Sequence, residues 1–228
     1  MARVQLDRDG DVFVLRLENG ENRFRPDFLA EIGAALDEVE GAGTPAALVT
    51  TGSGKFYSNG LDLDWMLGEG RAEAGPYMAA VLGLFARTLC FPAPTVSALN
   101  GHAFGAGAQW SLSHDYRIMR ADRGFFCMPE IDMRSPLHPG MTAVIQARLP
   151  RQTAHEVIAM GKRYGGEDAL ACSIVDAVAP EAEVVAAAVE LAAPLAGKAH
   201  PVMQTLKRDM YPEALAILEG SLAGSPGA

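Results

Sequence analysis

Twice along the chain, a strand-like segment leads through glycine into the start of a helix. The longer case is TVSALNGHAFGAGAQW, residues 95–110, and the shorter is FYSNGLDLDW, residues 56–65. Helix starts leave main-chain N–H groups without intrahelical partners, and glycine lets another group approach that backbone closely. Either segment alone could be a simple tight turn. The two together predict a cradle of N–H groups for a negatively charged oxygen.

Around these turns, strand and helix patterns alternate. The turn pair Asp9-Gly10 predicts a hairpin between residues 4–6 and 12–17. Apolar spacing predicts helices over 26–40, 75–89 and 201–218, strands over 46–50, 95–99, 116–119 and 124–128, and a mobile surface loop over 68–75. This order predicts an α/β protein, with a core over residues 1–178 and a C-terminal α-helical region over 179–228.

Composition excludes several classes of function. A net charge of -9 without a local run of Lys and Arg argues against nucleic-acid binding. The three cysteines, Cys90, Cys127 and Cys172, lack metal-ligand spacing and suit a reducing compartment. No apolar run reaches membrane-spanning length, and the final residues GSPGA differ from the peroxisomal tripeptide. A cytoplasmic protein without membrane contact is therefore expected.

Four motifs in order carry a family resemblance: SNGLDL at 58–63, NGHAFGAGAQ at 100–109, MPEID at 128–132 and GKRYGGEDALACSIVDAV at 161–178. Over about residues 12–178, the chain resembles the crotonase superfamily, which includes enoyl-CoA hydratases and isomerases. The resemblance implies a crotonase-like spiral of ββα turns followed by C-terminal helices, assembled as a homotrimer or hexamer. It also implies an acyl-CoA substrate. CoA would arrive as part of that substrate, and neither a separate cofactor nor a metal is expected.

Carried over by position, the resemblance assigns the thioester oxygen to the main-chain N–H groups of Leu61 and Ala106. Fixed donors stabilise charge that develops on such an oxygen, and each is typically worth a factor of about 100 to 1000 in rate. The same motifs supply the other expected substrate-binding residues, which are Ser58, Gly60, Asp62, Leu63 and Gln109. In the family the position of Asp62 commonly anchors its loop.

The resemblance places one carboxyl in the site. Hydratases of the family have a glutamate at the position of Gln109 and a second in the motif matching MPEID, whereas this chain keeps only Glu130. An amide cannot act as a general base on water. One carboxyl can still move a proton from C2 to C4, as in Δ3,Δ2-enoyl-CoA isomerases, which the segments GLDL and SHDYRIM also resemble. Glu130 is therefore the expected single acid/base.

The surroundings of Glu130 predict its protonation behaviour. Phe125, Phe126, Met128, Ile131 and Met133 lie close to it in the sequence. An apolar environment disfavours the charged form of a carboxyl, so we expect a raised pKa. Other functions remain open: a weak hydratase or thioester hydrolase using Glu130 and a water held by Gln109, or a non-catalytic acyl-CoA binder.

Several further residues are candidates for other roles. The run SHD, residues 113–115, cannot align as a hydrolytic triad because its members are consecutive, and it is expected to end a helix. His102 is expected to be structural, whereas His138 is a candidate for contact with the acyl chain. The basic residues nearest the expected nucleotide site, and hence candidates for the CoA phosphates, are Arg23, Arg25 and Lys55.

Overall fold

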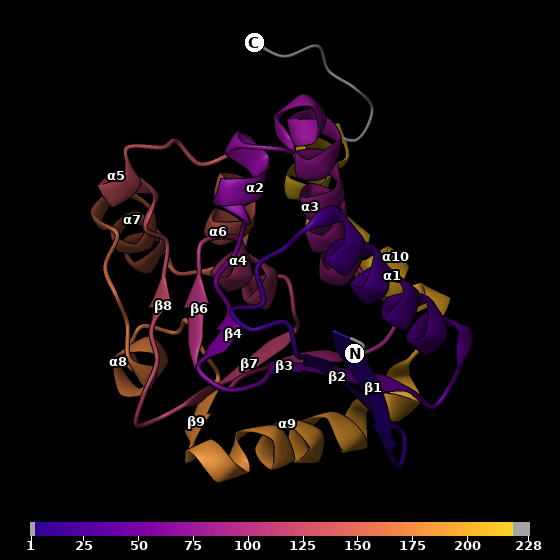
Figure 1. The fold of residues 1–228 in the computed structure, drawn as a ribbon. Coiled ribbons are helices and arrows are strands. Elements are labelled where there is room, and N and C mark those ends of the chain that lie inside the picture. The colour runs from indigo at the N-terminus through magenta and orange to yellow at the C-terminus, as the bar shows by residue number, and fades with distance from the viewer. Residues whose placement is uncertain (1–2, 221–228) are drawn as a thin grey trace.

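In the computed structural model, which describes residues 3–220, the chain winds through successive turns of two strands and a helix (Figure 1). A six-stranded sheet has the order β1 (Val4–Asp9), β2 (Val12–Leu17), β3 (Ala47–Gly52), β5 (Thr95–Leu99), β7 (Tyr116–Arg120) and β9 (Ala177–Ala179). A smaller sheet contains β4 (Phe56–Ser58), β6 (His102–Phe104) and β8 (Phe126–Cys127). In three successive turns the first strand joins the large sheet and the second joins the small one. The predicted ββα spiral is confirmed.

Turn chemistry explains how the sheet begins. Gly10 adopts φ +59° between β1 and β2, which pair antiparallel as the predicted hairpin. The other neighbouring strands of both sheets pair parallel, so their carboxyl ends lie at one edge. The two glycine-containing loops follow β4 and β6, which are themselves neighbours. The fold therefore brings both predicted N–H donors to the same edge of the small sheet.

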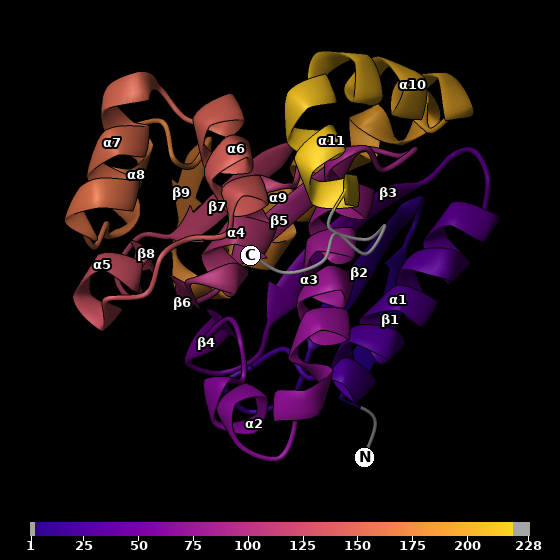
Figure 2. The ribbon, with the colours of Figure 1, turned by 90° about the horizontal axis from the view of Figure 1, so that it is seen from above.

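Helices cover both faces of the large sheet (Figures 1 and 2). The α-helices are α1 (Pro26–Gly41), α2 (Leu63–Leu67), α3 (Ala74–Leu89), α4 (Ala106–Leu112), α5 (Glu130–Met133), α6 (Pro139–Arg148), α7 (Arg151–Met160), α8 (Gly166–Ala171), α9 (Val184–Ala192), α10 (Pro201–Met210) and α11 (Pro212–Gly220). Three 3-10 turns lie at Arg71–Glu73, Glu181–Glu183 and Ala193–Lys198. The helix α9 lies across the face opposite α1 and α3.

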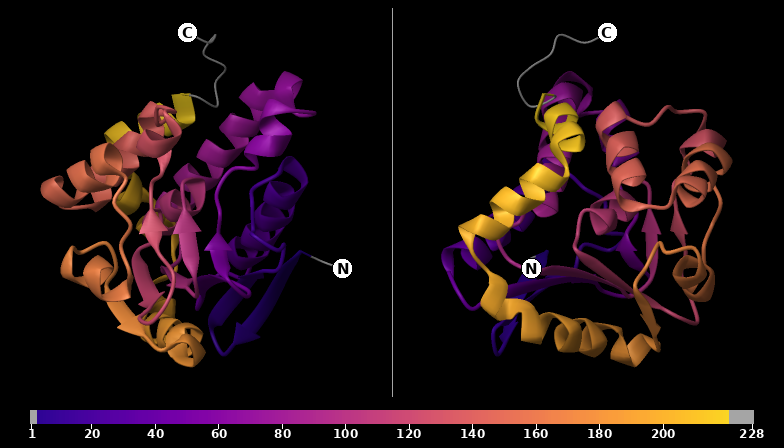
Figure 3. Two further views of the ribbon diagram at one scale, coloured as in Figure 1. Left: turned by 60° about the vertical axis from the view of Figure 1, so that its left-hand side comes forward. Right: turned by 180° about the vertical axis from the view of Figure 1, so that it is seen from behind.

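The strands have buried residues on both faces because successive side chains point in opposite directions. Along β2, Phe13 and Leu15 join the larger core beneath α1 and α3, whereas Val12 and Val14 join a second core with α9. Small residues on α9, such as Ala188 and Ala192, are fully buried against that face. The last helix, α11, packs on α6 and α3 (Figure 3).

The structure departs from some predicted element boundaries. The helix predicted over 201–218 is two helices, because Pro212 lacks an N–H group and disfavours helical backbone at Tyr211 before it. The loop predicted over 68–75 contains a 3-10 turn and the start of α3. The strand predicted over 124–128 is reduced to β8. Residues 221–228, including the GSPGA end, lie outside the described part of the chain.

A buried hydrogen-bond network joins α4 to the large sheet. His114 Nδ1 lies 2.9 Å from Trp110 O, which can only accept, so this nitrogen carries the proton. The other ring nitrogen then accepts from Thr50 Oγ1 at 2.9 Å, and Thr50 accepts from the Tyr57 hydroxyl at 2.9 Å. Full burial lowers the pKa of His114 to about 4. This histidine is therefore a neutral structural residue, in agreement with the interpretation of SHD as a helix end.

Acidification should destabilise the fold through His114. The unfolded chain takes up a proton near pH 6.5, whereas the folded chain does so near pH 4, so stability is lost as the pH falls through this range. We expect a loss of about 2 kcal/mol in the free energy of unfolding between pH 7.5 and pH 5 from this residue. Urea unfolding of the wild type and of His114→Gln measures it. An equal loss in both proteins would contradict this account.

Candidate active site

In the first glycine loop, the N–H group of Leu61 points away from Phe24, the residue that bonds to both of its neighbours. Phe24 N–H donates to Gly60 O at 2.8 Å, and Asp62 N–H donates to Phe24 O at 3.2 Å. In such a parallel bridge the central residue turns its own N–H to the opposite side. Gly60 holds φ +79°, a conformation that favours glycine. The Leu61 N–H group is thus available to a ligand.

Several side chains fix this loop. Asp62 caps α2, accepting from Trp65 N–H at 3.1 Å, so its carboxyl anchors the loop as the sequence suggested. The Tyr77 hydroxyl donates to Phe24 O at 2.7 Å and accepts from Asp62 N–H at 3.1 Å. Ser58 Oγ, which is buried, accepts from Gly60 N–H at 3.1 Å. Leu63 is the first residue of α2 and is partly exposed.

The second glycine loop ends where α4 begins. Gly105 adopts φ +49° and donates its N–H to Cys127 O at 3.0 Å. The first hydrogen bond of the helix runs from Gln109 N–H to Gly105 O at 2.9 Å. The N–H group of Ala106, at the first helical position, therefore has no partner within the helix.

The two loops pack directly against each other. A Cβ atom added at Gly60 would lie 2.7 Å from Phe104 O and 2.9 Å from Ala106 N. A Cβ at Gly107 would overlap Ser58 O and lie 2.6 Å from Ser58 Cβ. Only glycine fits at these two positions, so the small residues serve the approach of one loop to the other. The predicted Leu61 and Ala106 donors are thus on adjoining segments.

Glu130 lies beside this junction. It is the first residue of α5, and its Oε1 lies 3.5 Å from the Cβ position at Gly105, the residue before Ala106. Its Oε2 is buried and has no hydrogen-bond partner within residues 3–220. Burial raises the pKa of the Glu130 carboxyl above its usual value of 4.5, while the residue's own N–H opposes the shift. A carboxyl held in this way can accept and return a proton.

The apolar surroundings predicted for Glu130 are only partly present. Phe126 and Met128 are buried, as expected. In contrast, Phe125, which precedes β8, is 39% exposed. Ile131 and Met133 are 52% and 48% exposed, because they belong to α5, a four-residue helix at the surface. The direction of the pKa shift agrees with the prediction. Its source is the burial of the carboxyl beside Gly105 rather than a complete apolar shell.

Gln109 is fully buried and its amide already has a partner. Its Nε2 donates to Met141 O in α6 at 2.9 Å. The other amide atom, Oε1, is buried and accepts no hydrogen bond from the described residues. The oxygen is therefore the part of this side chain without a partner among the described residues, and its expected contact with a water or a substrate group stays a prediction.

The remaining histidine candidates have structural partners. His102 Nδ1 accepts from Phe125 N–H at 3.2 Å, and its ring contacts three phenylalanine rings, those of Phe56, Phe104 and Phe125. His138 caps α6 by accepting from Gly140 N–H at 3.1 Å. Burial lowers the pKa of both histidines. These contacts support the structural interpretation of His102 and give His138 a defined place at the start of α6.

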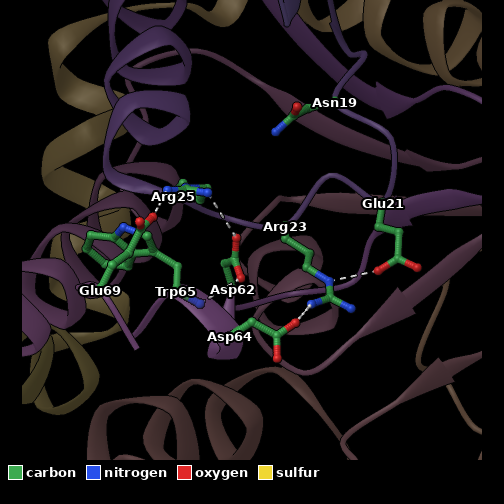
Figure 4. A pocket seen from close by; sticks show the side chains of 8 residues that line it. All are labelled: Asn19, Glu21, Arg23, Arg25, Asp62, Asp64, Trp65 and Glu69. Carbon is green, nitrogen blue, oxygen red and sulfur yellow. Dashed lines mark hydrogen bonds and ion pairs between the residues drawn. The ribbon is translucent and has the colours of Figure 1, made fainter. Parts of the chain in front are cut away.

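A surface hollow of about 700 Å³ lies next to the first loop (Figure 4). Its lining residues are Asn19, Glu21, Arg23, Arg25, Asp62, Asp64, Trp65 and Glu69. Both arginines are paired there: Arg23 with Glu21 at 2.7 Å and Asp64 at 2.9 Å, and Arg25 with Glu69 at 2.6 Å. Lys55 does not line this hollow, and its ammonium group lies over the Phe56 ring. The structure thus brings together two of the three predicted basic residues.

Sequence reasoning missed Asn22 and Tyr77, which hold the first loop. Asn22 is fully buried at φ +51°, and its amide donates to Phe56 O at 3.2 Å and Tyr57 O at 3.1 Å. A signal for Asn22 was its place in the turn after β2, since asparagine tolerates the left-handed backbone of such turns. Tyr77 gave no local signal, because its partners are 53 and 15 positions away.

The described residues contain neither a metal cluster nor a membrane-spanning helix. Between residues 3 and 220, no group of three or more His, Cys, Asp or Glu side chains is placed to hold a metal ion. None of the helices in that range combines the length and apolar character of a transmembrane segment.

Known proteins resemble this chain over almost its whole length. A family model described as enoyl-CoA hydratase/isomerase matches residues 7–220. The chain is 37% identical to enoyl-CoA delta isomerase 2, peroxisomal, of Arabidopsis thaliana, covering 93% of this chain and 94% of that protein. It is 29% identical to a probable enoyl-CoA hydratase of Bacillus subtilis, covering 97% and 87%.

Solved structures agree. An apo enoyl-CoA isomerase of Mycobacterium tuberculosis superposes with a TM-score of 0.89 at 25% identity, covering 97% of this chain and 96% of that one. The family match, residues 7–220, spans both glycine loops, the short helix that begins with Glu130 and the C-terminal helices. The chain therefore belongs to the enoyl-CoA hydratase/isomerase family of the crotonase superfamily, whose enzymes bind acyl-CoA substrates.

Proposed function

We propose that this enzyme is a Δ3,Δ2-enoyl-CoA isomerase, moving a double bond from the 3-position to the 2-position of an acyl-CoA thioester. The observation that carries the proposal is the Glu130 carboxyl, buried beside Gly105 with Oε2 unpartnered. The position of a second acid in hydratases holds Gln109, whose Nε2 is bonded to Met141 O. The identity to plant delta isomerases adds support.

The reaction requires one base and one site for negative charge. The Glu130 carboxylate takes a proton from C2, and the electron pair moves into a dienolate whose charge rests largely on the thioester oxygen. The N–H groups of Leu61 and Ala106 stabilise that oxygen. Glu130 then returns the proton to C4, and the double bond forms between C2 and C3. The carboxylate is regenerated, and no cofactor takes part in any step.

Product analysis separates this reaction from the alternatives. With a 3-enoyl-CoA and a 2-enoyl-CoA as paired substrates, we expect isomerisation of the first and little hydroxyacyl-CoA from either. Hydroxyacyl-CoA as the dominant product would establish a hydratase instead, and release of free CoA would establish a thioester hydrolase. Tight binding of acyl-CoA without any conversion would establish a non-catalytic binder.

The pH dependence of turnover should report Glu130. The carboxylate must be ionised to take a proton, so kcat/KM should fall as the pH drops through its pKa. Because burial raises that pKa, the acid limb should lie above pH 4.5. A kcat/KM profile between pH 4.5 and pH 8 measures this, after correction for the unfolding expected from His114. An acid limb at or below the ordinary glutamate value would contradict the assignment.

The hollow in Figure 4 is the proposed contact for the CoA phosphates. The CoA phosphates would replace Asp64 and Glu69 as the partners of Arg23 and Arg25. The two carboxylate side chains are 91% and 70% exposed, so they can give way to a ligand. The double variant Arg23→Gln/Arg25→Gln should then raise KM about 10-fold with little change in kcat, because the CoA phosphates are bound equally well in the ground state and in the transition state. The neighbouring Lys55→Gln is the control. An unchanged KM in the double variant would remove the phosphates from this hollow.

Assembly and location remain predictions of the sequence. A homotrimer or hexamer is expected, and light scattering of the purified protein measures it directly; a monomer would contradict the expectation. The expected cytoplasmic location differs from that of the Arabidopsis relative, whose name places it in peroxisomes. Fractionation of the source cells would decide between the two locations.

A further inference from the structure

Gln109 joins two helices in the interior of the protein. Its side chain is fully buried in α4, and Nε2 donates to Met141 O in α6 at 2.9 Å. Met141 is itself buried, at 4% exposure. The two residues are 32 positions apart. The other side-chain hydrogen bond between α4 and α6 within residues 3–220 runs from Arg148 Nε to Leu112 O at 3.0 Å, at the last residues of both helices, so the Gln109 bond is the one that holds the start of α6.

The same helical turn also contacts the C-terminal helix. Gly140 precedes Met141, and a Cβ added at Gly140 would lie 2.8 Å from Leu218 Cδ2 in α11. Leu218 is fully buried, and α11 makes its most extensive helix contact with α6. The first turn of α6 therefore contacts both Gln109 of α4 and Leu218 of α11. Its position depends on the C-terminal helix as well as on α4.

Gln109 also lies close to Ala106, the proposed donor to the thioester oxygen. Gln109 follows Ala106 by three residues, about one turn of α4, and its main-chain N–H bonds to Gly105 O beside Glu130. We infer that Gln109 is a positioning residue: its bond to Met141 O fixes the start of α6 relative to the helix whose first N–H group binds the thioester oxygen. This inference rests on the proposed isomerase function.

The chemistry of the contact gives a specific substitution. Only the amide NH2 donates to Met141 O, because Oε1 cannot. Methionine has nearly the same length and is apolar, so Gln109→Met removes the donor without opening a large cavity. We expect kcat for isomerisation to fall about 10-fold or more, as small misplacements of reacting groups do, while KM changes less than about threefold. The exposed Gln146 of α6 gives the matched control, Gln146→Met.

A second variant distinguishes positioning from loss of packing. In Gln109→Glu, the carboxyl can donate to Met141 O only when it is protonated. The ratio of kcat in this variant to kcat in the wild type should therefore rise about threefold or more as the pH falls from 8 to 5.5. A flat ratio, or Gln109→Met with wild-type kcat, would overturn the inference while leaving the isomerase function intact.

Hydrogen exchange tests the inference without any turnover. In Gln109→Met, exchange of the main-chain amides of residues 140–142, in the first turn of α6, should accelerate about 10-fold, whereas Gln146→Met should leave it unchanged. Unchanged exchange in Gln109→Met would overturn the positioning role. If the wild type fails to isomerise a 3-enoyl-CoA, the proposed function is wrong, and this measurement still reports whether Gln109 holds α6.

Discussion

In the Glu130→Gln variant, conversion of a 3-enoyl-CoA to its 2-enoyl isomer should fall by about 100- to 10,000-fold, the usual contribution of a general acid/base. Glutamine has almost the same shape but cannot take a proton from C2. The N–H groups of Leu61 and Ala106 are untouched, so binding of the thioester should remain. Steady-state turnover and a separate binding titration measure the two quantities.

The fold should tolerate this change. Glu130 Oε2 is buried without a partner, so replacing an ionised carboxyl by an amide removes a desolvation penalty at neutral pH. The sign follows from the raised pKa: the wild type becomes less stable relative to the variant as the pH rises through that pKa. Asp132→Asn, an exposed acid in the same short helix, is the matched control. Wild-type turnover in Glu130→Gln would exclude the carboxyl as the proton shuttle.

The second large effect is expected from Ala106→Pro. Proline has no N–H group, so the substitution removes one of the two proposed donors to the thioester oxygen. Loss of one such donor lowers kcat by about 100- to 1000-fold. Proline is well accepted at the first position of a helix, where no intrahelical hydrogen bond is lost. Gly105 precedes it with ψ -122° and has no Cβ to clash with the ring.

Ala106→Gly is the control for this prediction. It changes the same side chain but keeps the main-chain N–H group, so turnover should stay within about threefold of the wild type. Thermal unfolding of both variants verifies that α4 still forms. If Ala106→Pro folds and turns over like Ala106→Gly, the Ala106 N–H group does not act on the reaction.

Local chemistry explains which features could be predicted from the sequence. The strand-to-helix turns at Gly60 and Gly105 could be predicted because a positive φ and a close backbone approach both favour glycine. This preference is local and does not depend on the rest of the fold. The hairpin at Gly10 follows from the same property. The anchoring role of Asp62 could also be predicted, because a helix cap bonds to a main-chain N–H group only three residues away.

Features that depend on distant parts of the chain were not predictable. The partner of Gln109 is a carbonyl 32 residues away, and the partners of Arg23 and Arg25 include Asp64 and Glu69, which lie more than 40 residues away. Neighbours in sequence were also a poor guide to the environment of Glu130. Ile131 and Met133 lie within three residues of it but are 52% and 48% exposed, because α5 is a four-residue helix at the surface.

The break between α10 and α11 shows how two sequence signals can conflict. Apolar spacing continues across Tyr211 and predicts one helix, whereas Pro212 predicts a boundary. In the structure the proline decides the outcome, and the two helices pack differently. Lys207 of α10 bonds to Phe91 O at 3.0 Å and Asp115 at 2.7 Å, whereas α11 packs on α6 and α3.

A crystal structure of the enzyme with a saturated acyl-CoA thioester tests the central claim most directly. The claim is that two main-chain donors and one carboxyl meet at the same substrate group. The thioester oxygen should lie within about 3.2 Å of both Leu61 N and Ala106 N, with the Glu130 carboxyl facing C2 of the acyl chain. A thioester oxygen bound away from these two nitrogens, or a Glu130 carboxyl turned away from C2, would contradict it.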